Sequence, residues 1–355
     1  MKRGLVFAKY DTLAASTRQR LVQAIPYLNA AGIAIDIQPL FDNEYLADLF
    51  VHGKRDRLTI LHAYGRRLRA LMHARDYDFL WVHCELFPYL PGVMEALIAF
   101  ARTPVIFDFD DAIFHQYDQH RSPFVRRVLG KNLVPLLRRC DLAFCGNSYL
   151  EAYVKPYCAH TVILPTTVDT DSYFVAPNAQ EGAPTLGWIG SPSTWQYCLP
   201  LADVFASFVT AGRAQMLVVG ANHAATASHP FAFRAWHEAK EIADIQQMDI
   251  GMMPLPDAPW ARGKCGYKLI QYMACGLPVI ASPVGVNREI VAHGVNGFLA
   301  ETEAEWRAAI EQLLSDAALR QRMGAAGRAT VEARYSIQHY GPIMAERITE
   351  LSKRL

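Results

Sequence analysis

Short apolar runs alternate with segments of helical periodicity along the first half of the chain. Six such runs predict buried strands at Gly4–Ala8, Ile33–Ile37, Phe79–His83, Val105–Phe109, Leu142–Cys145 and Val162–Leu164. Apolar residues at helical spacing predict one helix over Thr17–Ala31, closed by Gly32, and a second, basic helix over Tyr64–Ala74. This alternation is typical of a parallel sheet that helices cover on both faces.

The same alternation starts again after the segment Pro165-Thr-Thr-Val-Asp169. Residues 175–184, VAPNAQEGAP, are rich in Pro, Gly and small polar residues and predict an exposed connection. Beyond it we predict strands at Thr185–Ile189, Gln215–Val219, Ile250–Met253 and Val279–Ala281, and helices at Leu199–Val209, Tyr267–Cys275 and Glu303–Leu314. We therefore expect an α/β fold of two doubly wound domains, in which ligands lie beyond the carboxyl ends of the strands.

Length and composition fit two domains that each bury a core. The chain has 355 residues, of which 52% are hydrophobic and 19% charged, and it contains no uncharged apolar run of the roughly 18 residues that a membrane span needs. The basic start is followed by a short apolar run, Gly4–Ala8, and then by Lys9 and Asp11. We interpret this run as a first strand and not as a signal peptide, so a cytoplasmic location is expected.

The seven cysteines and the net charge of +1 argue against some classes of site and partner. No CxxC pair occurs, so metal and disulfide frameworks are not expected, and we interpret most cysteines as small core residues. The small net charge argues against a nucleic-acid partner.

Basic residues nevertheless gather in two stretches of the first half. Residues 53–75 contain Lys54, Arg55, Arg57, Arg66, Arg67, Arg69 and Arg75 against a single acid, Asp56. Residues 121–139 contain Arg121, Arg126, Arg127, Lys131, Arg138 and Arg139 against none. Because Leu61, Tyr64, Leu68, Leu71 and Met72 interleave with the first set, this helix fits weak contact with an anionic membrane. A solvated helix face explains the same pattern.

The chemistry of the chain is concentrated between Pro254 and Ala300. Gly263 and Gly266 permit close backbone approach just before a predicted helix, whose N-terminus favours a phosphate. Three cations, Arg262, Lys264 and Lys268, are expected to gather there and bind a diphosphate. We expect Lys268 and Gln271, three residues apart, to share a face that looks into a cleft. The alternative is an ordinary solvated basic helix start.

The run Lys268-LIQYMACGLPVIAS, followed by Gly285, Glu289, Gly294 and Gly297-Phe-Leu, resembles the donor-binding signature of family four glycosyltransferases. Trp188-Ile-Gly-Ser-Pro-Ser-Thr194 looks like the first strand and turn of that family's second domain, and Met216-Leu-Val-Val-Gly220 like its next strand. The resemblance implies a retaining enzyme of GT-B architecture, with two Rossmann-like domains facing across a cleft. It covers the second half of the chain well and the first half loosely.

The family motif of two glutamates, separated by seven residues, is replaced by Gly263 and Gln271 in this chain. The resemblance implies that Gln271 accepts from the nucleotide ribose through its amide oxygen, and that backbone N–H groups near Cys265 replace the first glutamate. The donor-binding residues implied by the resemblance and the helix start are Gly190, Ser191, Lys264, Cys265, Gly266, Gln271 and Glu289. Arg262 and Lys268 are expected to stabilise the leaving diphosphate electrostatically.

Polar residues also follow predicted strands of the first half. Asp108-Phe-Asp110-Asp111 matches the Asp-x-Asp metal motif of the other large glycosyltransferase class, but the cluster of basic residues makes a metal redundant. We therefore expect Asp110 and Asp111 to orient acceptor hydroxyls or to cap the next helix. His83 and Glu85 are expected to contact the donor sugar and the acceptor, or to be structural. Arg18, with Arg20 nearby, is a weaker candidate for the acceptor side.

Taken together, these residues predict a metal-independent transferase that moves a sugar from a nucleotide-diphosphate donor to a saccharide or lipid-linked acceptor, with no cofactor. Synthesis of surface polysaccharide or glycoconjugate, at the inner membrane face, would fit. A sugar-nucleotide 2-epimerase of the same architecture and a non-catalytic nucleotide-sugar-binding protein are the alternatives. The expected domains are residues 1–167 and 168–335, with a helix over 336–355 that crosses back to the first.

Overall fold

The computed structural model describes residues 1–52, 56–176, 182–221 and 229–351, and it divides the chain into two compact units. The first unit comprises Met1–Thr166, Gly263–Cys265 and Tyr340–Leu355, and the second comprises Thr167–Arg262 and Gly266–His339. Lys54, Arg55, half of the connection at 175–184 and the last four residues of the expected terminal helix lie outside the described residues.

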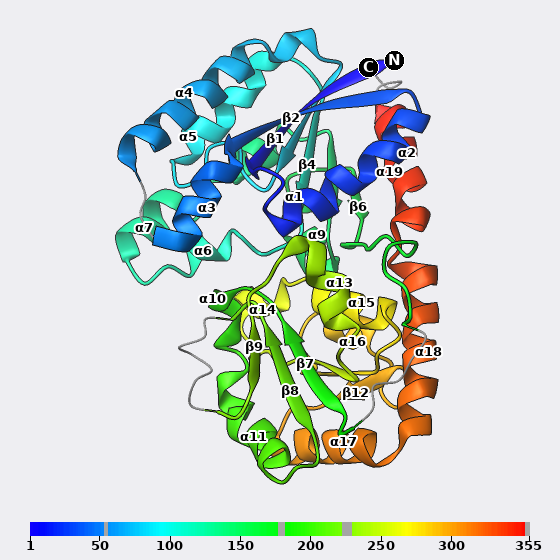
Figure 1. Ribbon diagram of the computed structural model, residues 1–355. Helices are drawn as coiled ribbons and strands as arrows, with labels where there is room; N and C mark the ends of the chain where they lie inside the picture. Colours follow the sequence, from blue (N-terminus) through cyan, green and yellow to red (C-terminus); the bar gives the residue numbers. More distant parts are fainter. Residues whose placement is uncertain (53–55, 177–181, 222–228, 352–355) are drawn as a thin grey trace. The chain divides into compact units, whose positions relative to one another are not determined.

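The first unit contains a six-stranded parallel sheet (Figure 1). Its strands are β1 (Lys2–Tyr10), β2 (Ile33–Phe41), β3 (Phe79–His83), β4 (Val105–Phe109), β5 (Leu142–Cys145) and β6 (Thr161–Ile163). The strand order is β2-β1-β3-β4-β5-β6, so the chain reverses direction across the sheet between β1 and β3. Strands β3, β4 and β5 are buried along their whole length, which explains their continuous apolar sequences.

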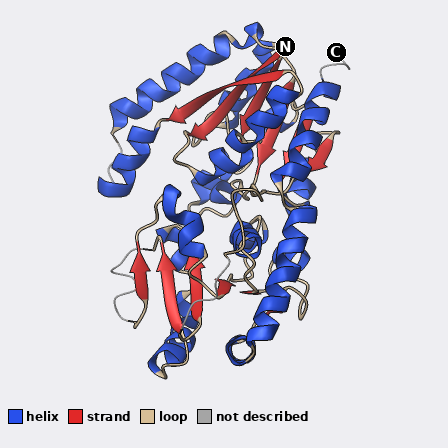
Figure 2. Cartoon of the chain, turned by 45° about the vertical axis from the view of Figure 1, so that its right-hand side comes forward, coloured by secondary structure: helices blue, strands red, loops and turns tan. Residues whose placement is uncertain are grey.

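Helices accompany this sheet in the usual alternation (Figure 2). They are α1 (Ala15–Arg20), α2 (Ile25–Ala30), α3 (Asn43–His52), α4 (Arg57–Met72), α5 (Gly92–Glu95), α6 (His115–Asp118), α7 (Pro123–Leu129), α8 (Val134–Leu137) and α9 (Ser148–Val154). The single helix predicted over Thr17–Ala31 is wrong: α1 and α2 are separate, joined by a short 3-10 turn. Pro26 lies in the first turn of α2, where its missing N–H costs nothing, so a new helix starts there.

The second unit contains another six-stranded parallel sheet, in the order β12-β11-β10-β7-β8-β9. Its strands are β7 (Thr185–Ile189), β8 (Gln215–Val219), β9 (Ala232–Arg234), β10 (Ile250–Met253), β11 (Val279–Ala281) and β12 (Gly297–Leu299). Starting from β7, the chain first moves outward to β8 and β9, then returns to β10 on the other side. This is the Rossmann order, and its switch point lies between β7 and β10.

The helices of the second unit surround this sheet and continue into a long helical tail. They are α10 (Pro192–Trp195), α11 (Ala202–Thr210), α13 (Glu241–Ile245), α14 (Pro259–Arg262), α15 (Tyr267–Ala274), α16 (Asn287–Ile290), α17 (Glu303–Ser315), α18 (Ala317–Arg334) and α19 (Ile337–Leu351). Helix α19 begins in the second unit, and its residues from Tyr340 onward group with the first. No helix within the described residues is long and apolar enough to cross a membrane.

Candidate functional site

The switch point of the second sheet brings Lys268 to the carboxyl end of β7. Trp188 is the second-last residue of β7. The Lys268 ammonium nitrogen lies 5.5 Å from the centre of the Trp188 ring. A Cβ atom added to Gly190 would lie 2.6 Å from Lys268 Cε, so the absence of a side chain at Gly190 makes room for the lysine. A fixed cation therefore occupies the edge of the sheet where open α/β folds bind ligands.

The start of α15 forms a second part of this edge. Gly266 precedes the helix in a left-handed conformation, with φ of 65°, and as the N-cap residue it offers no side chain to cap the helix. Gly285 is also left-handed, and a Cβ on it would lie 2.5 Å from the carbonyl oxygen of Arg262. The glycines thus permit a tight backbone turn into α15, and the positive end of the helix dipole at this turn favours an anion.

Two of the three expected cations have carboxylate partners in the structure. Arg262 forms a two-pronged ion pair with Asp257, with N–O distances of 2.6 and 3.0 Å. Lys264 belongs to the first unit, where its ammonium lies 3.5 Å from the Asp111 carboxylate. The expectation that Arg262, Lys264 and Lys268 bind one diphosphate stays a prediction, and Arg262 and Lys264 would have to exchange their carboxylate partners for it. Lys268 is the cation that lies at the switch point.

Gln271 lies one turn further along α15, but it does not lie open to a ligand. Its side chain is 3% exposed, and its amide nitrogen donates to the Tyr173 hydroxyl at 2.9 Å and to the Glu241 carboxylate at 2.8 Å. Tyr173 and Trp236 also donate to Glu241, at 2.5 and 2.7 Å. The expectation that Gln271 shares an open face with Lys268 is thus wrong. The carboxylate at this position of the structure is that of Glu241, which accepts from the Gln271 amide.

Glu241 and Asn287 are the polar residues of this edge that sequence reasoning missed. Glu241 lies 30 positions before Gln271, and no motif connects the two. The side-chain oxygen of Asn287 is buried without a hydrogen-bond partner and would lie 3.5 Å from a Cβ on Gly266, at the start of α15. A search for polar residues that follow strand ends could have found Asn287, since it comes shortly after β11.

The remaining donor-side candidates lie at the surface of the second unit or in the first. Ser191 is exposed at the start of α10, directly after Gly190. Glu289 is exposed on α16. The thiol of Cys265 is buried and donates to the Asp110 carbonyl at 2.7 Å, so this residue groups with the first unit.

A buried ion pair organises the carboxyl edge of the first sheet. Arg20 is 2% exposed and Asp108 is fully buried, and the guanidinium binds both oxygens of this carboxylate. His83 Nδ1 donates to the same carboxylate at 3.1 Å. Burial alone would raise the pKa of Asp108, but Arg20 and the hydrogen bond from His83 outweigh it and lower the pKa. Asp108 is therefore a structural anion, which removes it from any Asp-x-Asp metal pair, and Arg20 does not reach a ligand.

Glu85 is also structural. Its carboxylate is 1% exposed and accepts from the Tyr117 hydroxyl at 2.6 Å and from the Asn132 amide at 3.2 Å, with Lys9 at 3.9 Å. Burial raises the pKa of this carboxyl. The expectation that Glu85 positions an acceptor hydroxyl is therefore wrong, because all of these partners hold it inside the first unit.

The other acceptor-side candidates are Arg18, Asp110 and Asp111. Arg18 and Asp111 are held by contacts within the protein, and neither aspartate has the helix-capping role that was expected as an alternative. Arg18 donates to the carbonyls of Thr12 and Leu13, at 2.7 and 2.9 Å. Asp111 accepts from the N–H of Ala112 and faces Lys264. Neither Asp110 nor Asp111 caps the next helix, because α6 begins only after Phe114. Asp110 remains half-buried beside His83, at the ends of β4 and β3.

Comparison with known sequences identifies part of the second unit. Residues 183–316 match the family model described as glycosyl transferases group 1. The D-inositol 3-phosphate glycosyltransferase of Stackebrandtia nassauensis is 32% identical over 108 residues, which is 30% of this chain and 23% of the relative. The chain therefore matches less than a quarter of that relative's length.

Solved structures share the fold along the whole chain. The sucrose-phosphate synthase of Thermosynechococcus elongatus has a TM-score of 0.75 at 16% identity, with 100% of both chains covered. HepE of Anabaena, in complex with UDP and glucose, has a TM-score of 0.73 at 18% identity, covering 98% of this chain and 100% of HepE. At such identities the likeness concerns the fold alone. Residues 183–316 therefore form a glycosyl transferases group 1 region in a chain that has the GT-B fold of two Rossmann-like units.

Proposed function

We propose that the chain is a retaining glycosyltransferase that moves a sugar from a nucleotide-diphosphate donor to a saccharide or lipid-linked acceptor. The observation that carries this proposal is the position of Lys268, beside Gly190 at the switch point and one residue inside the uncapped start of α15. An ammonium group beside the positive end of a helix dipole suits a diphosphate. The family match over residues 183–316 and the UDP and UDP-glucose complexes of HepE support the same donor class.

In this proposal Lys268 contributes mainly to the departure of the diphosphate. Negative charge grows on the leaving group as the bond to the sugar breaks, and a fixed cation stabilises that charge more than it stabilises the intact donor. The leaving diphosphate takes the acceptor proton, so no enzymic base is required, and no resident metal is required to neutralise it. This agrees with the buried, fully bonded state of Glu85, which is not available as a base.

Incubation with a panel of nucleotide sugars and acceptors distinguishes the candidate functions. Release of nucleotide together with a new glycoside supports a transferase. An isomerised sugar without release would indicate a 2-epimerase, and binding without turnover would indicate a non-catalytic protein. Lys268→Ala should weaken donor binding, whereas Arg322→Ala, which removes an exposed cation of α18 in the same unit, should not. Equal affinity of Lys268→Ala and the unchanged protein would contradict the diphosphate assignment.

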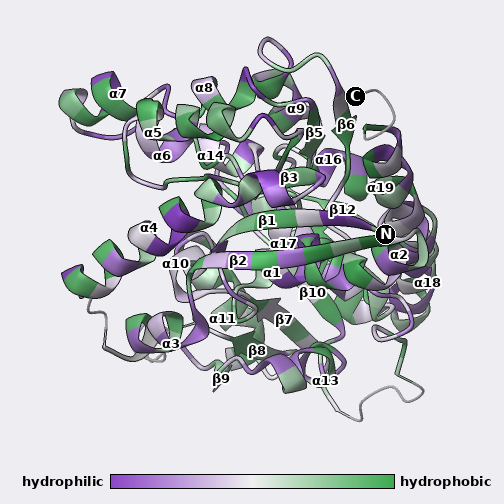
Figure 3. Cartoon of the chain, turned by 90° about the horizontal axis from the view of Figure 1, so that it is seen from above, coloured by the Kyte–Doolittle hydropathy of each residue, from purple (hydrophilic) through white to green (hydrophobic). Residues whose placement is uncertain are grey.

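We further propose that the first unit contacts anionic membranes weakly through α4. Leu58, Leu61, Leu68 and Met72 recur at helical spacing and are 42–68% exposed, and Arg66 and Arg69 are exposed on the same helix. Hydrophobic and hydrophilic segments alternate along α4 (Figure 3). An exposed apolar stripe with flanking cations suits the boundary between lipid headgroups and acyl chains. The structure also corrects the basic set, since Arg67 is fully buried and bonded to Gln38 and Leu86.

Flotation with vesicles tests this contact. Vesicles of phosphatidylglycerol at low salt should carry the chain upward, and neutral phosphatidylcholine vesicles should not. The double variant Leu61→Glu/Met72→Glu should lose the association. Leu199→Glu, which changes a comparably exposed leucine of the second unit, is the matched control. Absence of binding to the anionic vesicles would leave α4 as an ordinary solvated helix.

A further inference from the structure

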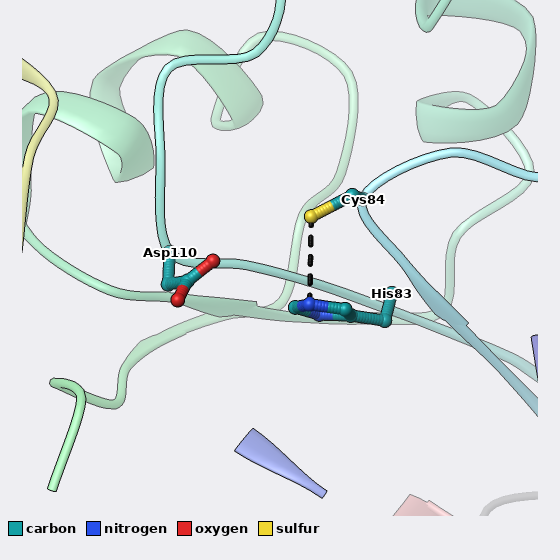
Figure 4. Close-up of side chains that lie close together, drawn as sticks. All are labelled: His83, Cys84 and Asp110. Carbon is teal, nitrogen blue, oxygen red and sulfur yellow. Dashed lines mark hydrogen bonds between the residues drawn. The ribbon is translucent and has the colours of Figure 1, made fainter. Parts of the chain in front are cut away.

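Three potential metal ligands of the first unit converge where β3 and β4 end. His83 is the last residue of β3, Cys84 follows it, and Asp110 follows β4 (Figure 4). Their ligand atoms all lie within 4.8 Å of one another. Because β3 and β4 are parallel neighbours, the sheet itself fixes the two backbones that carry these side chains.

The imidazole of His83 is oriented by its neighbours. Asp108 is an ionised carboxylate held by Arg20, so His83 Nδ1 donates its hydrogen to it. The other ring nitrogen, Nε2, then lies 3.6 Å from the Cys84 sulfur. A histidine whose second nitrogen donates to a carboxylate is the usual arrangement around protein-bound metals, because the carboxylate fixes the ring and increases its basicity.

The backbone at Cys84 is strained. Its φ is 69°, in the left-handed region that a side chain with a Cβ rarely adopts. Its N–H donates to the Asp108 carbonyl at 2.7 Å, and the next N–H, of Glu85, turns back to the His83 carbonyl at 3.0 Å. This turn directs the thiol toward the imidazole, and such strain persists where the side chain has a task.

We propose that His83, Cys84 and Asp110 bind a divalent zinc ion, with water as the fourth ligand. A tetrahedral zinc with bonds of about 2.3 Å to sulfur and about 2.0 Å to nitrogen holds those two atoms about 3.5 Å apart, close to the separation of 3.6 Å seen here. A thiolate and a carboxylate together balance the charge of the ion, and sulfur and imidazole ligands favour zinc over magnesium. Closing the site requires a shift of about 1 Å by the side chains.

The proposed ion has a different role from the diphosphate contact proposed for Lys268. Asp108 is engaged with Arg20 and His83, so the ion would not be held by an Asp-x-Asp pair. It would instead join the ends of β3 and β4 in the first unit, and the bond to sulfur would offset the energetic cost of the left-handed backbone at Cys84. The simple alternative is a hydrogen bond between a neutral thiol and the imidazole, with no metal affinity.

Metal titration of the full-length protein tests the proposal. After removal of bound metals with a chelator, Zn²⁺ alone is titrated against a chromophoric competitor, and Co²⁺ alone is followed by absorption. We expect one equivalent of each ion to bind, and the cobalt form to show a thiolate-to-metal charge-transfer band. Cys84→Ser should abolish this band, and Asp110→Asn should weaken zinc binding at least 10-fold. Cys198→Ala, at a buried cysteine of the second unit, should leave both readouts unchanged.

Two results would overturn the proposal. One is the absence of stoichiometric zinc or cobalt binding at micromolar concentrations, and the other is a charge-transfer band of full strength in Cys84→Ser. Asp110 is half-buried on a loop, so Asp110→Asn provides a test even if Cys84→Ser does not fold. These readouts need no sugar donor, so their outcome is independent of whether the chain is a transferase.

Discussion

Replacing Gly190 with alanine should displace the Lys268 ammonium without removing its charge. A Cβ at this position would lie 2.6 Å from Lys268 Cε and 2.8 Å from two carbons of the Trp188 ring. Carbon atoms in contact lie about 3.5–4.0 Å apart, so the lysine has to move by about 1 Å. Trp188 is 2% exposed and resists movement, so the flexible lysine gives way first. We also expect a loss of stability of about 1–3 kcal/mol from overpacking.

The effect on donor binding follows from the loss of one charged contact. A hydrogen bond to a charged group contributes about 1.5–3 kcal/mol, so the affinity for nucleotide should fall about 10- to 100-fold. Isothermal calorimetry with UDP, GDP and ADP measures this, and the nucleotide that binds most tightly is then used for the variants. Gly65→Ala is the control, because nothing lies within 4 Å of a Cβ at that helical glycine.

The double variant Gly190→Ala/Lys268→Ala shows whether the lysine transmits the effect. If it does, the double variant binds nucleotide no more weakly than Lys268→Ala alone. Additive losses, or full affinity in Gly190→Ala, would refute the reasoning that Gly190 acts by making room for Lys268.

Three further changes test the buried polar groups. Gln271→Glu, although it restores the acidic residue of the family motif, should lower the melting temperature, because it places a second carboxylate against Glu241; a higher melting temperature would contradict this. Arg20→Met should destabilise the protein by about 3–5 kcal/mol in urea unfolding, since it leaves Asp108 buried without its cation, and a loss below about 1 kcal/mol would argue against a strong ion pair. Burial raises the pKa of Glu95 to about 8, so its contribution to stability is present below pH 4.5 and is lost as the pH rises to about 8. The decline, of up to about 5 kcal/mol, should be absent in Glu95→Gln, and an unchanged pH profile would contradict the assignment.

The strands β3, β4, β5 and β7 could be predicted from sequence because each is a short apolar run that is buried along its whole length. The predictions for these four strands and for β8 coincide with the observed bounds. The prediction of one helix over Thr17–Ala31 was wrong because apolar spacing alone does not show that a new helix starts at Pro26. Short edge strands such as β9 were missed because half-exposed residues carry no apolar run.

The site was predicted less completely than the fold. Strand ends and the Rossmann order direct attention to Gly190 and His83, since these positions follow from local sequence. The partner of Lys264 does not follow, because Asp111 lies 153 positions away and reaches it only through tertiary structure, whereas Asp257 lies five positions from Arg262 and could have been considered. Glu241 could not be found either, because its contact with Gln271 joins two elements with no shared motif. The sequence therefore predicts which residue types lie at the carboxyl edge of each sheet. Which of these side chains are open to a ligand depends on tertiary packing.

The discontinuity of the first unit has a consequence for the order in which the protein is made. Arg20 also donates to the carbonyl of Leu164, 144 residues further on, and Lys2 donates to the carbonyl of Thr349, 347 residues away. At a synthesis rate of roughly 5–20 residues per second, Thr349 emerges roughly 10–40 seconds after the last strand of this unit. During this interval the newly synthesised first unit lacks the C-terminal helical segment that completes it, and chaperones can bind the surface that this segment later covers.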